Sequence, residues 1–187
     1  MIKHFPNLLT LFRIFMIPGL VILYLIPGPL GNWLACLIFY LAAITDYLDG
    51  WLARKLQATS EFGRMLDPIA DKLMVVAVII ILIEFRDISG IHTLAAGLII
   101  MREILISWFR EYLTDRGVTL EVSQIAKFKT TIQMIALGIL LMGEAGEMIS
   151  PIIKMTELGL FWTATFFTIW TAIDYLSKGL ALLKVKN

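Results

Sequence analysis

Four aspartates gather in one short stretch of an otherwise apolar chain. They are Asp46, Asp49, Asp67 and Asp71, arranged as an Asp-x2-Asp pair followed by an Asp-x3-Asp pair. At about 100° per residue along a helix, Asp46 and Asp49 share one face, and the second pair lines one stripe of the next helix. A short connection makes two such helices antiparallel neighbours. The spacing therefore predicts that all four carboxylates lie at a similar depth in one cluster.

Four carboxylates beside an apolar phase need positive charge nearby. Inserting a single aspartate at the centre of a membrane helix costs roughly 2.5–3.5 kcal/mol, and crowding like charges adds repulsion. Arg54, Arg64 and Lys72 do not lie on the acidic stripe. Mg²⁺ prefers hard oxygen ligands and commonly bridges carboxylates and substrate phosphates, and two such ions can clamp a phosphoryl group during displacement. The cluster therefore indicates divalent cations and phosphoryl-group chemistry.

Small residues accompany the acids. Gly50 and Ala53 fall on the face of Asp46 and Asp49, and Gly63 lies on the stripe of the second pair. Small residues often mark close helix packing in membranes, which is the simplest explanation for a glycine taken alone. Because these residues share a face with the acids, we favour the interpretation that a ligand approaches the backbone there.

The elements that position the acids must be membrane helices. The chain has 187 residues, 59% of them hydrophobic, with a mean hydropathy of +0.83, whereas soluble domains average about 45–50% apolar residues. A span needs roughly 20 apolar residues, so the length allows about six spans and no sizeable soluble domain. The prediction is an all-α integral membrane protein with six transmembrane helices in a single domain over residues 1–187. The helices are expected near 8–26, 33–55, 61–84, 91–114, 124–143 and 155–183.

The distribution of basic residues predicts the orientation. If the N-terminus is cytoplasmic, Arg86 and Lys154 are the only two of the 16 lysines and arginines that fall on the outer side. Both termini and the aspartates then face the cytosol. The first 13 residues fit either an interfacial amphipathic helix or a lead-in to the first span. The single cysteine, Cys36, excludes a disulfide framework, and the net charge of +1 gives no sign of a nucleic-acid partner.

The acidic region resembles the signature of the CDP-alcohol phosphotransferase family. The pattern D-x2-D-G-x2-A-R-x8-G-x3-D-x3-D, with eight fixed residues, is matched at every defined position between residues 46 and 71. The resemblance implies six spanning helices, a site at the cytoplasmic side of the membrane and usually a homodimer. It also implies transfer of a phosphatidyl group from a CDP-linked lipid, here CDP-diacylglycerol, to an alcohol.

The resemblance also implies roles for individual residues. Asp46, Asp49, Asp67 and Asp71 would bind two divalent metals, Mg²⁺ or Mn²⁺, and Asp71 would be the general base. An ordinary aspartate has a pKa of about 3.9, so positioning and metal activation should matter more than basicity. The residues expected to contact CDP-diacylglycerol are Asp49, Gly50, Ala53, Arg54, Gly63 and Asp67.

Polar residues elsewhere could select the acceptor alcohol. Arg102 lies inside an apolar run and needs a partner or a solvated cavity, and Glu103 points about 100° away from it, so Glu103 is not the obvious partner. Each basic residue alone would by default extend to the lipid headgroups. Together they indicate a pocket for a phosphorylated alcohol such as glycerol 3-phosphate. The predicted pocket consists of Thr10, Arg13, Arg102, Arg110, Lys127 and Lys129.

The second half of the chain resembles the phosphatidylglycerophosphate synthase branch of the family. Residues 102–110 fit R-E-x-x-[IV]-S-x-x-R, and residues 126–133 fit G-K-x-K-T-x-x-Q except that Ala126 replaces the glycine. The resemblance implies glycerol 3-phosphate as acceptor in a bacterial cell membrane. The alternatives are a family member that uses inositol phosphate or phosphatidylglycerol, and, more remotely, an intramembrane prenyltransferase or a cation carrier. Asp174, in the last helix, is expected to make an interhelical hydrogen bond or a contact near the inner end.

Overall fold

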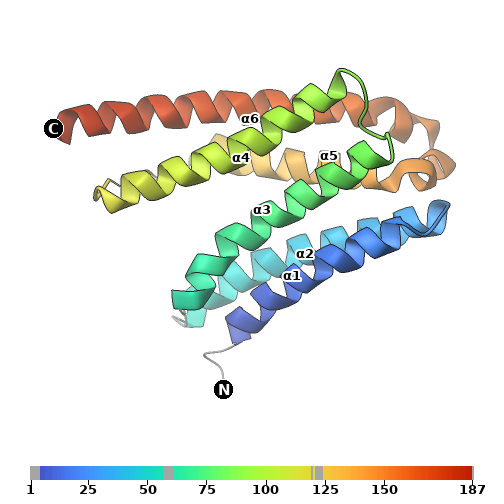
Figure 1. Cartoon of the computed structure of the whole chain (residues 1–187), viewed down its shortest axis with the longest axis horizontal. Coiled ribbons are helices and arrows are strands. Elements are labelled where there is room, and N and C mark those ends of the chain that lie inside the picture. Colours follow the sequence, from blue (N-terminus) through green and yellow to red (C-terminus); the bar gives the residue numbers. More distant parts are fainter. Residues whose placement is uncertain (1–4, 57–60, 119, 121–123, 187) are drawn as a thin grey trace.

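The computed structural model describes residues 5–56, 61–118, 120 and 124–186. Within these ranges it describes the side chains of all residues except 5–11, 46–56, 61–68, 71, 124, 126, 185 and 186. The described residues form six helices (Figure 1): α1 (Phe5–Tyr24), α2 (Pro29–Leu56), α3 (Glu61–Glu84), α4 (His92–Asp115), α5 (Gln124–Ile149) and α6 (Pro151–Lys186).

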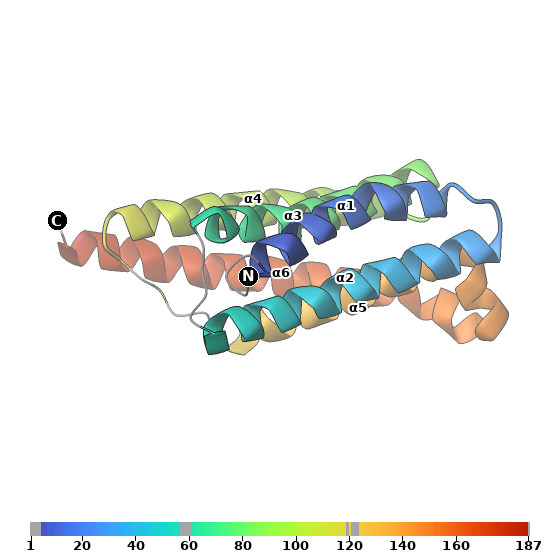
Figure 2. The ribbon, with the colours of Figure 1, turned by 90° about the horizontal axis from the view of Figure 1, so that it is seen from below.

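The helices run alternately up and down one elongated bundle. The end of α2, the start of α3, the end of α4, the start of α5 and the end of α6 lie toward one end, which we call the aspartate end (Figures 1 and 2). The connections α1–α2, α3–α4 and α5–α6 lie at the opposite end. Successive helices of the described residues therefore run in opposite directions.

Prolines mark helix starts where the sequence was expected to be non-helical. The expected starts near 33 and 155 are wrong by about one turn, because α2 begins at Pro29 and α6 begins at Pro151. Proline suits the first turn of a helix, where its missing N–H would have no helical partner anyway. The bounds of α3, by contrast, agree with the expected 61–84.

Gly143 interrupts α5. Its φ of 44° and ψ of −123° are not helical, so the regular helix ends at the expected residue, although helical structure resumes as far as Ile149. The side chain of Asn32 in α2 covers this break: its Nδ2 donates to the carbonyl oxygen of Leu141 at 3.3 Å. A β-carbon at Gly143 would lie 3.0 Å from the same Nδ2, so the site suits glycine for two reasons.

Length and composition identify membrane helices. Among the described residues, the helical stretches His92–Asp115, Lys127–Ile149 and Pro151–Lys184 are long and apolar enough to cross a bilayer, and Phe12–Tyr24 and Pro29–Thr45 are shorter apolar stretches. Large apolar side chains are exposed along the outside, such as Phe15 and Trp108. A surface of this kind fits a lipid environment.

Two apolar clusters hold the bundle together. The larger one fills its centre with Leu20, Phe39, Ile79 and Leu137, all fully buried. The smaller one, which we call the terminal cluster, lies toward the aspartate end of α4 and α6. It comprises Phe109, Leu113 and Val118, with Tyr112, Leu120, Tyr175, Leu176 and Leu183 packed against them.

Candidate active site

The fold brings the two aspartate-bearing segments to one end of the bundle. Asp46 and Asp49 belong to the second half of α2, and Asp67 and Asp71 belong to the first half of α3. These helices run in opposite directions, and only residues 57–60 separate them (Figure 1). The expected depth of the two pairs therefore agrees with the backbone, while the side chains of all four acids lie outside the described set.

For five further predicted site residues the structure likewise describes the backbone but not the side chain. Their roles therefore stay predictions. They are Thr10 in α1, Gly50, Ala53 and Arg54 in α2, and Gly63 in α3.

Two helices, α1 and α5, contact both members of the aspartate-bearing pair. Both α1 and α5 contact α2, and both contact α3. A polar side chain that points inward from α1 or α5 is therefore well placed to reach the region of the acids. Each of the two helices carries one buried cation, Arg13 in α1 and Lys129 in α5, and both residues are only about 2% exposed.

Lys129 belongs to a mostly buried ionic cluster between α4 and α5. Its Nζ donates to Oε1 of Glu103 in α4. Nη1 of Arg102 lies 3.4 Å from the same carboxylate oxygen. Glu103 therefore lies between two cations, and we call these three side chains the Arg–Glu–Lys cluster.

Hydroxyl and amide groups extend this cluster to α6. Nη2 of Arg102 donates to Oγ1 of Thr171 at 3.3 Å. The hydroxyl of Thr168 donates to Oε1 of Gln133, also at 3.3 Å. Gln133 and both threonines are buried. Three helices, α4, α5 and α6, are thus joined by polar contacts inside an apolar bundle, where such contacts satisfy groups that lipid could not.

Glu103, which is not the obvious partner of Arg102 by sequence, does pair with it. The two Cα–Cβ bonds do diverge by about 100°, as helix geometry requires. However, the arginine side chain is long enough to fold back along the helix surface, so that its guanidinium reaches the neighbouring carboxylate. The angle between faces constrains short side chains far more than long ones.

Arg110 and Lys127, the other described members of the predicted pocket, lie on the exposed surface. The guanidinium of Arg110 lies over the ring of Tyr175, 5.7 Å from its centroid, which is a cation–π arrangement between α4 and α6. Lys127 is two residues before Lys129, so it points to a different side of α5. The structure thus unites Arg102 with Lys129 and leaves Arg110 and Lys127 at the periphery.

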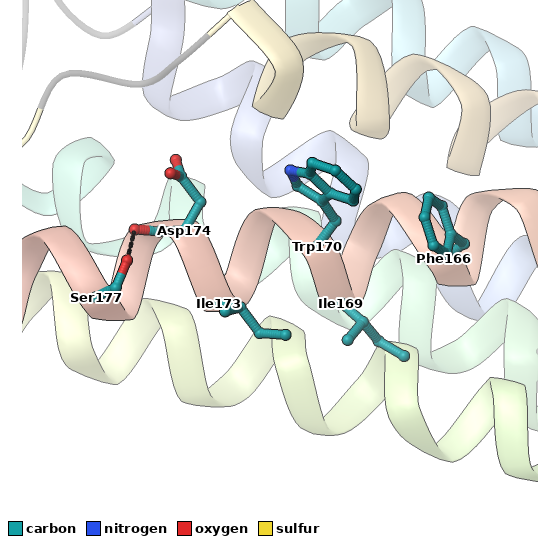
Figure 3. A pocket seen from close by; sticks show the side chains of 6 residues that line it. All are labelled: Phe166, Ile169, Trp170, Ile173, Asp174 and Ser177. Carbon is teal, nitrogen blue, oxygen red and sulfur yellow. Dashed lines mark hydrogen bonds between the residues drawn. The ribbon is translucent and has the colours of Figure 1, made fainter.

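An open apolar pocket lies on the outer face of α6. Its volume is about 460 Å³, and Figure 3 shows Phe166, Ile169, Trp170, Ile173, Asp174 and Ser177 along it. Asp174 pairs with Lys178 on the same helix at 2.7 Å, and its backbone carbonyl accepts a hydrogen bond from the Ser177 hydroxyl at 2.9 Å (Figure 3). The interhelical hydrogen bond considered for Asp174 is therefore replaced, among the described residues, by an ion pair within α6.

Comparison with known proteins decides the family. The model of the family described as CDP-alcohol phosphatidyltransferase matches residues 3–170. The chain belongs to this family. Membership accounts for the match between residues 46 and 71 and excludes the two remote alternatives, an intramembrane prenyltransferase and a cation carrier, as explanations of the acidic pattern.

Relatives within the family are similar over almost their whole length. They include proteins named CDP-diacylglycerol–glycerol-3-phosphate 3-phosphatidyltransferase. The protein from Rickettsia bellii is 44% identical over 92% of this chain and 93% of its own. Those from Haemophilus influenzae and Escherichia coli K12 are 42% and 39% identical, covering 92% and 95% of this chain and 91% and 96% of their own.

The donor set of the family signature suits divalent cations. Asp46, Asp49, Asp67 and Asp71 offer only carboxylate oxygens, the hard ligands that Mg²⁺ and Mn²⁺ prefer. The backbone places both pairs at the same end of two connected helices. These residues therefore fit such ions by chemistry and by the placement of their helices.

Sequence reasoning did not identify the polar partners of the cationic residues. The predicted pocket does not include Glu103, and the sequence does not predict Gln133, Thr168 or Thr171 as partners. The sequence does contain a signal for them: each is a hydrogen-bonding side chain within a predicted span, where such groups usually face another helix. Which helix each one faces depends on tertiary packing.

Proposed function

We propose that this protein transfers the phosphatidyl group of CDP-diacylglycerol to sn-glycerol 3-phosphate, giving phosphatidylglycerophosphate and CMP. The relatives named for this reaction are similar to this chain over more than 90% of its length and more than 90% of their own. The observation that carries the proposal for this chain is the Arg–Glu–Lys cluster, in which a buried lysine and a mostly buried arginine come from helices that contact the aspartate-bearing α3. An acceptor with a phosphate group requires such cations, whereas an uncharged alcohol does not.

The chain's own residues would orient the two substrates. Arg102 and Lys129, with Arg13 and Thr10 of α1, would bind the phosphate of glycerol 3-phosphate and leave its primary hydroxyl directed toward α3. Arg110 and Lys127 lie on the exposed surface, so they would not bind this phosphate directly. Asp49, Gly50, Ala53, Arg54, Gly63 and Asp67 would hold the CDP part of the lipid. Positioning of this kind converts a reaction between two molecules into one within a complex, which supplies much of the rate.

The reaction is a single displacement at phosphorus. The hydroxyl oxygen of glycerol 3-phosphate forms a bond to the phosphorus that carries the diacylglycerol, and the bond from that phosphorus to the oxygen bridging to CMP breaks. Asp71 would accept the proton of the attacking hydroxyl, and CMP leaves with the electron pair. Asp46, Asp49, Asp67 and Asp71 would hold two divalent metal ions, Mg²⁺ or Mn²⁺. When bound, these ions neutralise charge on the diphosphate and on the departing CMP.

The protein would act in a bacterial cell membrane as a multi-pass protein with six spans, usually as a homodimer. Arg86 lies in the α3–α4 connection and Lys154 at the start of α6, both at the end opposite the aspartates. The sequence predicts that the other basic residues lie on the side of the aspartates. By the positive-inside rule, the site and both termini would face the cytosol, where glycerol 3-phosphate is found.

Release of CMP from CDP-diacylglycerol tests this function. Purified protein in detergent should release CMP with glycerol 3-phosphate and much more slowly with inositol phosphate, phosphatidylglycerol, glycerol or serine. EDTA should stop the reaction, and added Mg²⁺ or Mn²⁺ should restore it. Turnover with another acceptor but not with glycerol 3-phosphate would assign the protein to a different branch of the family.

A further inference from the structure

We propose that Glu103 is a positioning residue that holds Arg102 and Lys129 together as one two-cation receptor for the acceptor's phosphate monoester. This inference rests on the proposed function and deepens it. Glu103 would not touch the substrate. It would act through the two cations that do.

The contacts of Glu103 carry the first step. Oε1 accepts from the Lys129 ammonium and lies 3.4 Å from Nη1 of Arg102, so one carboxylate oxygen serves cations from two different helices. All three side chains are mostly buried: those of Glu103, Arg102 and Lys129 are 16%, 14% and 3% exposed. Without the carboxylate, two like charges would share a site with little water to screen them.

The charge balance carries the second step. These three side chains sum to one positive charge, so the cluster attracts an anion even with the carboxylate in place. A pair built only to tie α4 to α5 would need one lysine and one glutamate. The additional arginine gives the cluster the surplus that a phosphate monoester requires, and its planar fork suits phosphate geometry.

The hydrogen bonding of Arg102 carries the third step. Its Nη1 faces Glu103 and its Nη2 donates to Thr171, so two neighbours fix the plane of the guanidinium. Its Nε is buried, and within the described part of the chain it has no hydrogen-bond partner. An arginine has five N–H donors, so this one keeps unused donor capacity while its orientation is already fixed. A preorganised donor of this kind is what anion recognition needs.

The position in the bundle carries the fourth step. Glu103 lies near the middle of α4 and Asp71 near the middle of α3, and the two helices are antiparallel and joined by a short connection, so these residues lie at similar depth. Helix α3 contacts both α4 and α5. The cluster therefore lies at the level where the acceptor hydroxyl would have to meet the phosphatidyl group.

Substitution of Glu103 separates positioning from simple structural support. In Glu103→Gln, the KM for glycerol 3-phosphate should rise by about tenfold or more while kcat falls by less than about threefold, because ground-state binding of the acceptor is what is lost. The KM for CDP-diacylglycerol should not change. Glu103→Asp, which keeps the charge, should recover most of the loss. Glu111→Gln is the matched control, since Glu111 is an exposed glutamate of the same helix, and it should match wild type.

A double-mutant cycle tests whether Glu103 acts through Lys129. If it does, the KM of Glu103→Gln/Lys129→Gln should be close to that of Lys129→Gln alone. In the Lys129→Gln background, the lysine that the Glu103 carboxylate would hold is already absent, so removing the carboxylate has little further effect. Thr171→Val provides a milder variant that leaves every charge in place. It releases one tether of Arg102 and should raise the KM for glycerol 3-phosphate by about threefold.

Three results would overturn the inference. They are an unchanged KM for glycerol 3-phosphate in both Glu103→Gln and Thr171→Val, an equal loss toward both substrates, and strictly additive effects in the double-mutant cycle. Failure of the proposed function looks different, because wild-type protein would then not turn over glycerol 3-phosphate at all. If wild type is active and Glu103→Gln behaves like wild type, only the positioning role is wrong.

Discussion

At the scale of single residues, the chain uses carboxylates in contrasting settings. Glu103 is mostly buried between two cations from different helices, whereas Asp174 forms an ion pair with Lys178 on the half-exposed surface of α6. Charges interact strongly in the first setting, because little water screens them. In the second setting water screens the ion pair, which therefore contributes little to stability. Both residues are acids within apolar helices, so sequence alone ranks them alike. Burial and the identity of the partner separate them.

This contrast leads to a prediction for Asp71, one of the four signature acids, and for Asp174. Asp71→Asn should lower CMP release by about 10²–10⁴-fold, because a general base and a metal ligand are lost together. Asp174→Asn should remain within about twofold of wild type, because an exposed ion pair contributes little. The measurement is CMP release at saturating glycerol 3-phosphate. Comparable losses in the two variants would remove the reason for placing the chemistry at the signature.

At the scale of elements, apolar periodicity and turn residues predicted the helices well, and α3 to the residue. The errors at Pro29 and Pro151 arose because proline both ends and begins helices, and only the three-dimensional path of the chain decides which. The partners of the helices were less accessible. That α5 contacts both α2 and α3, and that its Lys129 pairs with Glu103 of α4, follows from packing of the whole bundle and leaves no local mark in the sequence.

Two glycines of α6 test this packing. A β-carbon at Gly179 would lie 2.5 Å from Cε1 of Phe109 and 3.0 Å from Cδ1 of Leu113, both buried in α4, whereas one at Gly159 would meet nothing within 4 Å. Gly179→Ala should therefore cost about 1–3 kcal/mol of stability through overpacking. Gly159→Ala should be neutral or stabilising by up to about 1 kcal/mol, because alanine favours the helix. Thermal unfolding in detergent measures both, and equal midpoints would contradict the α4–α6 contact.

At the scale of the whole molecule, the alternation of six helices places the signature residues and the ends of the chain on one side. Composition was enough to predict an all-α membrane protein, because few other folds can bury a chain this apolar. The orientation stays a prediction based on charge. The assembly of two copies into a homodimer is a prediction based on the family.

Cysteine labelling tests the orientation in intact cells. Cys36 is buried, so a Cys36→Ala background should be silent toward a membrane-impermeant maleimide. Ser89→Cys, exposed in the α3–α4 connection, should be labelled from outside, and Lys184→Cys, exposed near the end of α6, should be labelled only after permeabilisation. The reverse pattern would place the aspartates on the outer side and contradict the proposed access to cytosolic glycerol 3-phosphate.

The length of α6 has a consequence for how the two ends of the protein respond to solvent. Its 36 residues extend about 54 Å, whereas the hydrocarbon layer is only about 30 Å thick. If its start lies near the outer surface, its last turns and the terminal cluster of Phe109, Leu113 and Val118 project beyond the acyl chains. Apolar packing is driven by water there, but not among lipid tails. Urea should therefore loosen this projecting tip first, while the lipid-embedded helices keep their contacts.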